Sequence, residues 1–117
     1  MDKKEALKIL QKYDFDLENL PAHFKKDKKI VLEAVKLHGY ALDYADESLK
    51  KDKQIVLAAV KSIGSALKYA DESLKKDKQI VLEAVKQSSY NLQHADESLR
   101  NDPDILAIVN KKNKSLK

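Results

Sequence analysis

The chain has 117 residues, of which 43% are hydrophobic and 36% charged, with two glycines, two prolines and no cysteine. This length fits one domain, and the absence of cysteine excludes a disulfide framework, a thiolate nucleophile and a cysteine-based metal site. The formal net charge of +4 is the difference between 23 basic and 19 acidic residues, which by itself indicates no partner.

The N-terminal segment interleaves charged and apolar residues from Asp2 onward, so we expect no signal peptide. The longest apolar run covers residues 55–60, far short of the roughly 20 residues needed to cross a bilayer. We therefore expect no transmembrane segment. Together with the lack of cysteine, these features favour a cytoplasmic protein.

The sequence is a tandem array of 25-residue repeats. The second and third repeats are identical at 19 of 25 positions, and the third and fourth at 15, whereas the first repeat fits the frame loosely. The repeats occupy residues 2–26, 27–51, 52–76, 77–101 and, as a half repeat, 102–110. We predict one helical-repeat domain over residues 2–110, followed by a basic tail at 111–117.

Each repeat after the first begins with an aspartate that we expect to cap a long helix. These aspartates are Asp27, Asp52, Asp77 and Asp102. Pro103 follows the last of them, at the first helical position, where its missing N–H costs nothing. Apolar residues cover more than half of the circumference of the helix that follows Asp27, so we expect neighbouring repeats to cover it on more than one side.

Gly39 and Gly64 are expected to end two of these helices in the left-handed backbone conformation. Ser89 takes the same position in the fourth repeat, at an expected cost of up to about 1 kcal/mol. On this interpretation, Ser89→Gly stabilises the protein.

A short second helix follows, with Ala41, Leu42 and Ala45 on its core face. Pro21 stands at the next repeat position in the first repeat, so we expect a break there. Aspartates stand at this position in the later repeats: Asp46, Asp71 and Asp96. Each is expected to cap a single turn whose leucine packs under the next repeat. This order of long helix, short helix and single turn predicts an all-α fold, a right-handed α-solenoid of 25-residue repeats.

The repeated motif resembles a known family. Residues 27–45 and 52–70 share the pattern D-K-x-x-V-L-x-A-V-K-x-x-G-x-A-L-x-Y-A, which is similar to short α-helical tandem repeats catalogued only as a domain of unknown function, found in bacterial, protist and giant-virus proteins. The resemblance covers residues 2–109. It implies a helical array that binds other macromolecules, and it implies no known chemistry. The fourth repeat departs from the pattern at Ser89, Asn91 and His94.

The sequence contains no constellation that predicts catalysis. His23, His38 and His94 fall at three different phases of the repeat, so stacking does not bring them together as a metal site or a catalytic base. The Asp-Glu pairs recur once per repeat, whereas a catalytic acid/base pair is expected to be singular. We therefore predict a protein that is not an enzyme and that has no cofactor and no metal.

One candidate binding surface is a row of aromatic side chains on the second helices, which we call the aromatic row. With Ala41 and Leu42 facing the core, Tyr40 and Tyr44 are expected to point away from it, and exposed tyrosines favour protein binding. The row consists of Tyr40, Tyr44, Tyr69, Tyr90 and His94. The alternative is that each ring lies on the next repeat with only its hydroxyl in water.

Sequence variation between the repeats adds to this interpretation. Positions 37, 38, 40 and 43 change from repeat to repeat, whereas the core positions do not. A scaffold that recognises a partner is expected to vary at such positions.

The other candidate surface, which we call the lysine edge, lies in the turns between repeats. It consists of Lys25, Lys26, Lys28, Lys50, Lys51, Lys53, Lys75, Lys76 and Lys78. Aligned lysines of this kind bind phosphates, but the capping aspartates within the edge offset much of its charge, so a solvated face is the alternative. We expect a scaffold for protein–protein interaction, with nucleic-acid or anionic-surface binding through the lysine edge as the second hypothesis.

Overall fold

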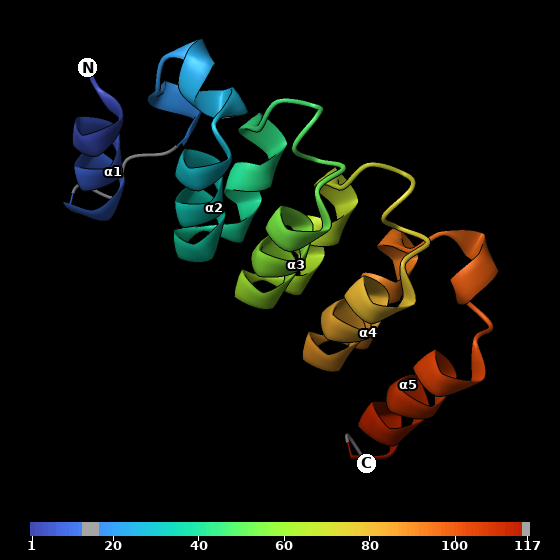
Figure 1. Cartoon of the computed structure of the whole chain (residues 1–117). Helices are drawn as coiled ribbons and strands as arrows, with labels where there is room; N and C mark the ends of the chain where they lie inside the picture. The colour runs from blue at the N-terminus through green and yellow to red at the C-terminus, as the bar shows by residue number, and fades with distance from the viewer. Residues whose placement is uncertain (13–16, 116–117) are drawn as a thin grey trace.

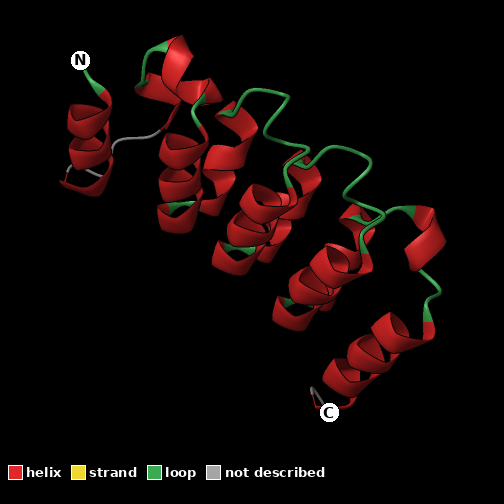
Figure 2. Cartoon of the chain, viewed as in Figure 1, coloured by secondary structure: helices red, strands yellow, loops and turns green. Residues whose placement is uncertain are grey.

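The computed structural model describes residues 1–12 and 17–115, and every regular element in these ranges is a helix (Figure 2). The last two residues of the predicted basic tail, 116–117, and residues 13–16 of the first repeat lie outside the described residues. The α-helices are α1 (Lys3–Lys12), α2 (Lys28–Leu37), α3 (Lys53–Ser62), α4 (Lys78–Gln87) and α5 (Pro103–Ser115). The helix α5 therefore continues past residue 110 into the predicted tail.

Shorter 3₁₀-helices connect the α-helices. They are η1 (Leu17–Asn19), η2 (Ala22–Lys26), η3 (Gly39–Tyr44), η4 (Gly64–Tyr69), η5 (Ser89–His94) and η6 (Glu97–Leu99). The predicted short second helix is thus present in the second, third and fourth repeats in the tighter 3₁₀ form. The predicted break after it is confirmed, because Ala45 is extended, with φ −73° and ψ 152°.

The α-helices lie side by side in chain order, and each contacts the next (Figure 1). The 3₁₀-helices η3, η4 and η5 form a second layer, in which η3 packs against both α2 and α3, and η4 against both α3 and α4. The chain is elongated, with extents of 50 × 28 × 16 Å. Its radius of gyration of 15.4 Å exceeds the value of about 13 Å expected for a compact domain of this length.

The predicted helix caps are confirmed. The Asp27 carboxylate accepts a hydrogen bond of 3.1 Å from the Ile30 backbone N–H, and Asp52 accepts one of 3.2 Å from Ile55. Asp77 and Asp102 do the same for the starts of α4 and α5. These bonds satisfy N–H groups that have no partner within the helix.

The core lies between the two layers. Ile30, Val31, Ala34 and Val35 of α2 are buried, as are the residues at the same positions in α3 and α4. Neighbouring repeats cover the apolar arc on more than one side, as expected, but the cover is incomplete, because Leu37 is 44% exposed and several leucines are half-buried. The half-buried leucines of the α-helices are Leu7, Leu32, Leu57 and Leu82.

The expected left-handed glycines are not observed. Gly39 and Gly64 are the first residues of η3 and η4, and neither has a left-handed backbone. The position needs glycine for a different reason, which is close approach to the next repeat. A Cβ atom on Gly39 would lie 2.6 Å from the Ala59 backbone oxygen, and one on Gly64 would lie 3.0 Å from the Ala84 backbone oxygen.

The predicted single turns are confirmed. The Asp46 carboxylate accepts hydrogen bonds from the Ser48 hydroxyl at 2.6 Å and from the Ser48 backbone N–H at 3.0 Å, and these bonds hold the pKa of Asp46 below its usual value. Asp71 and Asp96 cap the next two turns in the same way. The leucines of these turns pack on the core, with Leu49 buried.

Each single turn is also tied to the preceding repeat through the backbone. The N–H of Asp46 donates to the Lys25 carbonyl at 2.9 Å. The same bond joins Asp71 to the Lys50 carbonyl and Asp96 to the Lys75 carbonyl, each at 3.0 Å. These bonds fix the register between adjacent repeats.

Within residues 1–12 and 17–115, none of the helices has the length and apolar character required of a membrane span.

Candidate functional site: the exposed surfaces of the array

The aromatic row lies on the 3₁₀-helices. Tyr40, Tyr44 and Tyr90 are 46%, 37% and 82% exposed, whereas Tyr69 and His94 are half-buried. The structure thus places three of the five predicted residues with a large part of the ring in solvent. In η3, the neighbouring residues Ala41 and Leu42 are buried in the core, whereas Tyr40 and Tyr44 are partly exposed.

The row is continuous between the second and third repeats. The rings of Tyr40 and Tyr69 meet edge to face with centroids 6.1 Å apart, and the Tyr40 hydroxyl is 2.8 Å from the Ser65 hydroxyl. The Lys68 ammonium lies 4.9 Å from the centroid of Tyr69 and 5.9 Å from that of Tyr40. Tyr40 therefore lies partly on the next repeat, as the alternative interpretation predicts, while nearly half of it stays exposed.

His94 lies at the far end of the row. Burial lowers the pKa of this imidazole, and the nearby cations Lys68 and Lys75 lower it further, so the neutral form is favoured. His94 borders a polar groove of about 380 Å³. The groove is lined by both acidic and basic side chains, among them Glu72 and Lys75.

The lysine edge contains a regular ladder of ion pairs between repeats. The helices α2, α3 and α4 each begin with a lysine whose ammonium lies beside the capping aspartate of the next long helix. The N···O distances are 2.9 Å for Lys28–Asp52, 3.1 Å for Lys53–Asp77 and 3.2 Å for Lys78–Asp102. Burial raises the pKa of Asp52, but the hydrogen bonds from Lys28 and from the backbone of Ile55 outweigh it, so this pKa lies below its usual value.

The remaining lysines of the edge also have acidic neighbours. Lys50 pairs with Glu47 at 3.1 Å and Lys75 with Glu72 at 3.0 Å, with only 14% and 17% of the lysine side chains exposed. Lys26, Lys51 and Lys76 lie near the turn aspartates and help to lower their pKa values. The backbone carbonyl of Lys25 holds the turn at Asp46. The edge is therefore a mixed surface in which acidic groups offset much of the positive charge.

Some of the variable positions join repeats instead of facing a partner. The Ser62 hydroxyl accepts a hydrogen bond from the Gly39 N–H at 3.1 Å. At the same position of the next repeat, the Gln87 amide accepts from the Gly64 N–H and donates to the Val60 carbonyl, both at 2.6 Å. At these two sites, the variation that suggested partner recognition serves the contact between repeats. These hydrogen bonds between repeats could have been suspected from the sequence, because a polar residue, Ser62 or Gln87, stands at the end of α3 and of α4.

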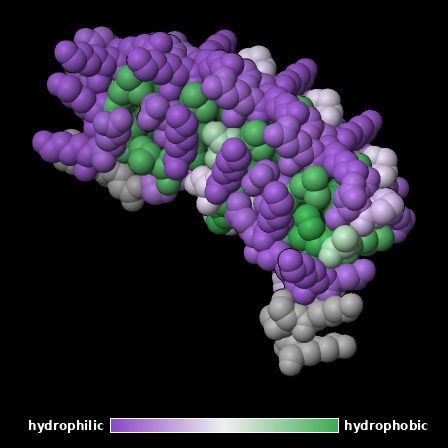
Figure 3. Space-filling model, turned by 60° about the horizontal axis from the view of Figure 1, so that its bottom comes forward, coloured by the Kyte–Doolittle hydropathy of each residue, from purple (hydrophilic) through white to green (hydrophobic). Residues whose placement is uncertain are grey.

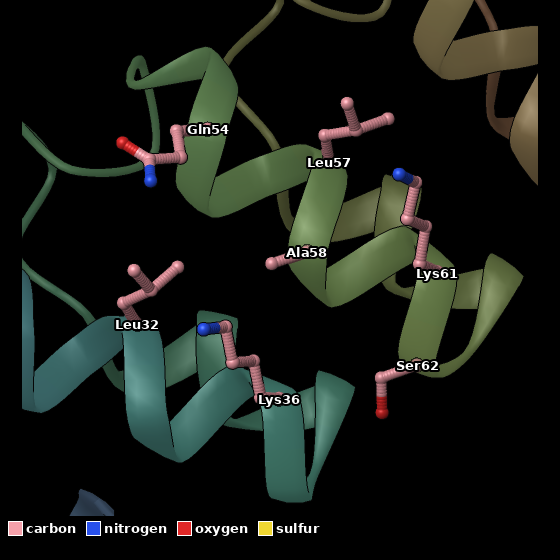
Figure 4. A pocket seen from close by; sticks show the side chains of 7 residues that line it. All are labelled: Leu32, Lys36, Gln54, Leu57, Ala58, Lys61 and Ser62. Carbon is pink, nitrogen blue, oxygen red and sulfur yellow. The ribbon is translucent and has the colours of Figure 1, made fainter.

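A groove that the sequence does not predict lies between α2 and α3. It measures about 470 Å³ and is lined by Leu32, Lys36, Gln54, Leu57, Ala58, Lys61 and Ser62 (Figure 4). The wide apolar arc of the long helix was the available signal, but we expected neighbouring repeats to cover it. Among the described residues, no group of three histidine, aspartate or glutamate side chains is arranged to hold a metal ion.

Comparison with known proteins identifies the repeats. The model of a family described as a domain of unknown function, DUF4116, matches residues 2–50, 28–75, 52–100 and 77–116. Each matched segment spans about two repeats, and consecutive segments share one repeat, so the resemblance seen in the sequence is confirmed. A search of curated proteins found no match, and neither did a search of solved structures.

Proposed function

We propose, starting from the fact that the chain belongs to the DUF4116 family, that it is a non-enzymatic scaffold whose aromatic row binds another protein. The observation that carries this proposal is the exposure of Tyr40, Tyr44 and Tyr90 on the same layer of helices. A tyrosine offers a large rigid ring and a polar hydroxyl at small entropic cost, which is why it is enriched where proteins meet.

We further propose that the repeats form a right-handed α-solenoid. Each long helix contacts the one before and the one after, and the chain is elongated, as expected when each repeat packs only on its neighbours. Arrays of this kind present extended surfaces that side chains of successive repeats share. Tyr40 and Tyr69, which come from successive repeats and contact each other, are such a pair.

The second hypothesis, nucleic-acid or anionic-surface binding, has weaker support. Phosphate binding needs lysines whose charge is available, and the ion pairs of Lys28, Lys53 and Lys78 occupy part of that charge. This hypothesis predicts retention on heparin or DNA that declines steeply with added salt. We expect elution at low salt instead.

The test of the proposed function is affinity capture from cells that encode the chain, with the wild type compared with a Tyr44→Ala, Tyr90→Ala double variant. Loss of an interfacial tyrosine costs about 2 kcal/mol of binding or more, so captured partners should be lost. Thermal stability should change little for Tyr90→Ala alone, because Tyr90 is 82% exposed, and more for Tyr44→Ala, because Tyr44 is 37% exposed, so the Tyr90→Ala single variant separates binding from stability. Tyr69 is unsuitable for this test because it packs on the core.

A Lys26→Ala, Lys51→Ala double variant is the matched control, because it removes two exposed side chains from the lysine edge. It should retain the partners that the tyrosine variant loses. If the two variants capture the same proteins as the wild type, the aromatic row is not the binding surface. If only the lysine variant loses its partners, the second hypothesis replaces the first.

A further inference from the structure

The groove between α2 and α3 combines apolar and cationic side chains. Leu32 and Leu57 stand on the two helices, and the Ala58 methyl group points into the space between them (Figure 4). The Lys36 side chain reaches toward that space from α2, and Lys61 stands beside Leu57 on α3. A ligand in this groove therefore meets hydrocarbon and ammonium groups together.

The same groove recurs between α4 and α5. There it measures about 370 Å³ and is lined by Lys86, Ile108, Lys111 and Lys112. These residues stand two repeats after Lys36, Ala58, Lys61 and Ser62, which line the first groove. Equivalent positions therefore line a groove at two junctions of the array.

No layer formed by residues 1–12 or 17–115 covers the apolar part of the groove. Leu32, Leu57 and Ala58 are half-buried, because they pack against the core on one side only. In a space-filling view, hydrophobic atoms reach the surface in a broken row along the array, bounded by hydrophilic side chains (Figure 3). Burial of such apolar surface by a ligand favours binding.

The charge of the two grooves has one sign. Among the described residues, each groove is lined by lysines and by no carboxylate. Glu33 and Glu83 lie nearby, but they hold Lys36 and Lys86 only loosely, at 3.9 Å and 3.7 Å. In α3 the glutamate position is taken by Ala58, so Lys61 has no glutamate one turn before it.

The geometry points to an acidic amphipathic helix of another protein as the ligand of the groove between α2 and α3. Leucines on one face of such a helix would cover Leu32, Leu57 and Ala58, and carboxylates beside them would pair with Lys36 and Lys61. A nucleic acid would use the lysines but gain nothing from the leucines. This surface lies on the α-helices and does not involve the aromatic row of the 3₁₀-helices.

The test uses a display library of helix-forming peptides of about 16 residues, long enough to hold helical structure. One face is randomised among Leu, Ser, Glu and Lys in equal proportion, and the wild-type chain is the bait. Selected peptides should be enriched in Leu at helical spacing and in Glu over Lys at the flanking positions. Enrichment of Lys over Glu, no enrichment of Leu, or no binder at all would overturn the proposal.

Two variants locate the binding site of the selected peptides. Ala58→Glu introduces the residue that the second and fourth repeats carry at this position, as Glu33 and Glu83, so the fold should persist. It should weaken the peptides by about fivefold or more, since a carboxylate then faces the peptide's own. Lys61→Gln, at an exposed position, should weaken them in the same direction.

Lys51→Ala is the charge-matched control, because it lowers the net charge by one, as Ala58→Glu does. It should change the affinity by less than about twofold, as expected for a charge outside the interface. If Ala58→Glu and the control have the same effect, the peptides bind elsewhere and the proposal fails. It also fails if single-stranded DNA displaces the peptides from the wild type but not from Lys61→Gln, since the groove is then a phosphate site.

Discussion

The junctions that start at Gly39 and Gly64 differ from the one that starts at Ser89. At the first two, the backbone of the 3₁₀-helix comes so close to the next long helix that a Cβ atom would meet a backbone oxygen at 2.6 Å or 3.0 Å. Ser89 carries a Cβ atom, so η5 and α5 are held further apart than these distances. Glycine in this repeat therefore sets the spacing between helices and does not supply a left-handed helix end.

The same two junctions carry a polar bridge. The N–H of Gly39 donates to Ser62, and the N–H of Gly64 donates to Gln87. Asn91, which is buried, adds a hydrogen bond of 2.8 Å from its side-chain amide to the Ala84 carbonyl. The close junctions thus combine tight packing with satisfied polar groups, and each can be disrupted separately.

The largest effect is expected for Gly39→Ala. The added methyl group would overlap the Ala59 oxygen and the Ile63 side chain, at 2.6 Å and 2.5 Å, and a backbone oxygen cannot move without shifting α3. We expect a loss of about 3 kcal/mol in the free energy of unfolding, measured by urea denaturation. Ser89→Ala is the control and should change it by less than about 0.5 kcal/mol. Equal effects of the two substitutions would refute the spacing role of the glycine.

Gln87→Ala should have the next largest effect. It removes the acceptor of the Gly64 N–H and the donor to the Val60 carbonyl, and Gly64 is buried. Leaving these groups without partners should cost about 2 kcal/mol. Gln87→Ser should cost less, because Ser62 forms the equivalent bond to Gly39. A loss in Gln87→Ala no greater than in Gln87→Ser would show that the acceptor for the Gly64 N–H contributes nothing, because both variants lose the donor to the Val60 carbonyl.

The sequence predicts the elements that depend on one repeat alone. The caps at Asp27 and Asp52, the break at Pro21 and the buried face of each helix follow from local chemistry and periodicity, and all are confirmed. Contacts between repeats are less predictable. A glycine after a helix is typical of both a left-handed end and a close approach, and only the position of α3 distinguishes them for Gly39.

The candidate surfaces show the same limit. The exposure of Tyr40 and Tyr44 follows from the helical spacing, but the contact of Tyr40 with Tyr69 depends on how two repeats stack. The groove beside Leu32 was missed because periodicity shows that a helix has a wide apolar arc without showing which part its neighbours cover. The stacking register also decides that Lys28 reaches Asp52 instead of remaining in solvent.

Ser89→Gly tests whether this position in the fourth repeat needs a left-handed residue, and its expected effect on stability is smaller than that of Gln87→Ala. A left-handed residue would be stabilised by this change, whereas Ser89 begins a 3₁₀-helix, where glycine only adds freedom to the unfolded chain. We expect a loss of about 0.5–1 kcal/mol in the free energy of unfolding, measured by urea denaturation. A gain in stability would show instead that the Ser89 side chain strains the junction with α5.

The smallest effect on stability is expected from breaking the ion pairs between repeats. These pairs also distinguish the junction between α3 and α4 from the one between α4 and α5. Lys53→Met removes the pair with Asp77, in which the lysine side chain is 49% exposed, so we expect a loss of about 0.5 kcal/mol that shrinks with added salt. Lys78 pairs with both Asp102 and Asp104, and the hydrogen bonds that its ammonium donates, first to Asp104 and then to Asp102, raise its pKa. Lys78→Met should therefore lose more stability than Lys53→Met in low-salt thermal melts, and the two should converge at high salt. If Lys53→Met lost more stability than Lys78→Met, charge pairing would matter more at the close junction between α3 and α4 than at the junction between α4 and α5. The junction with α5 would then depend mainly on its apolar contacts.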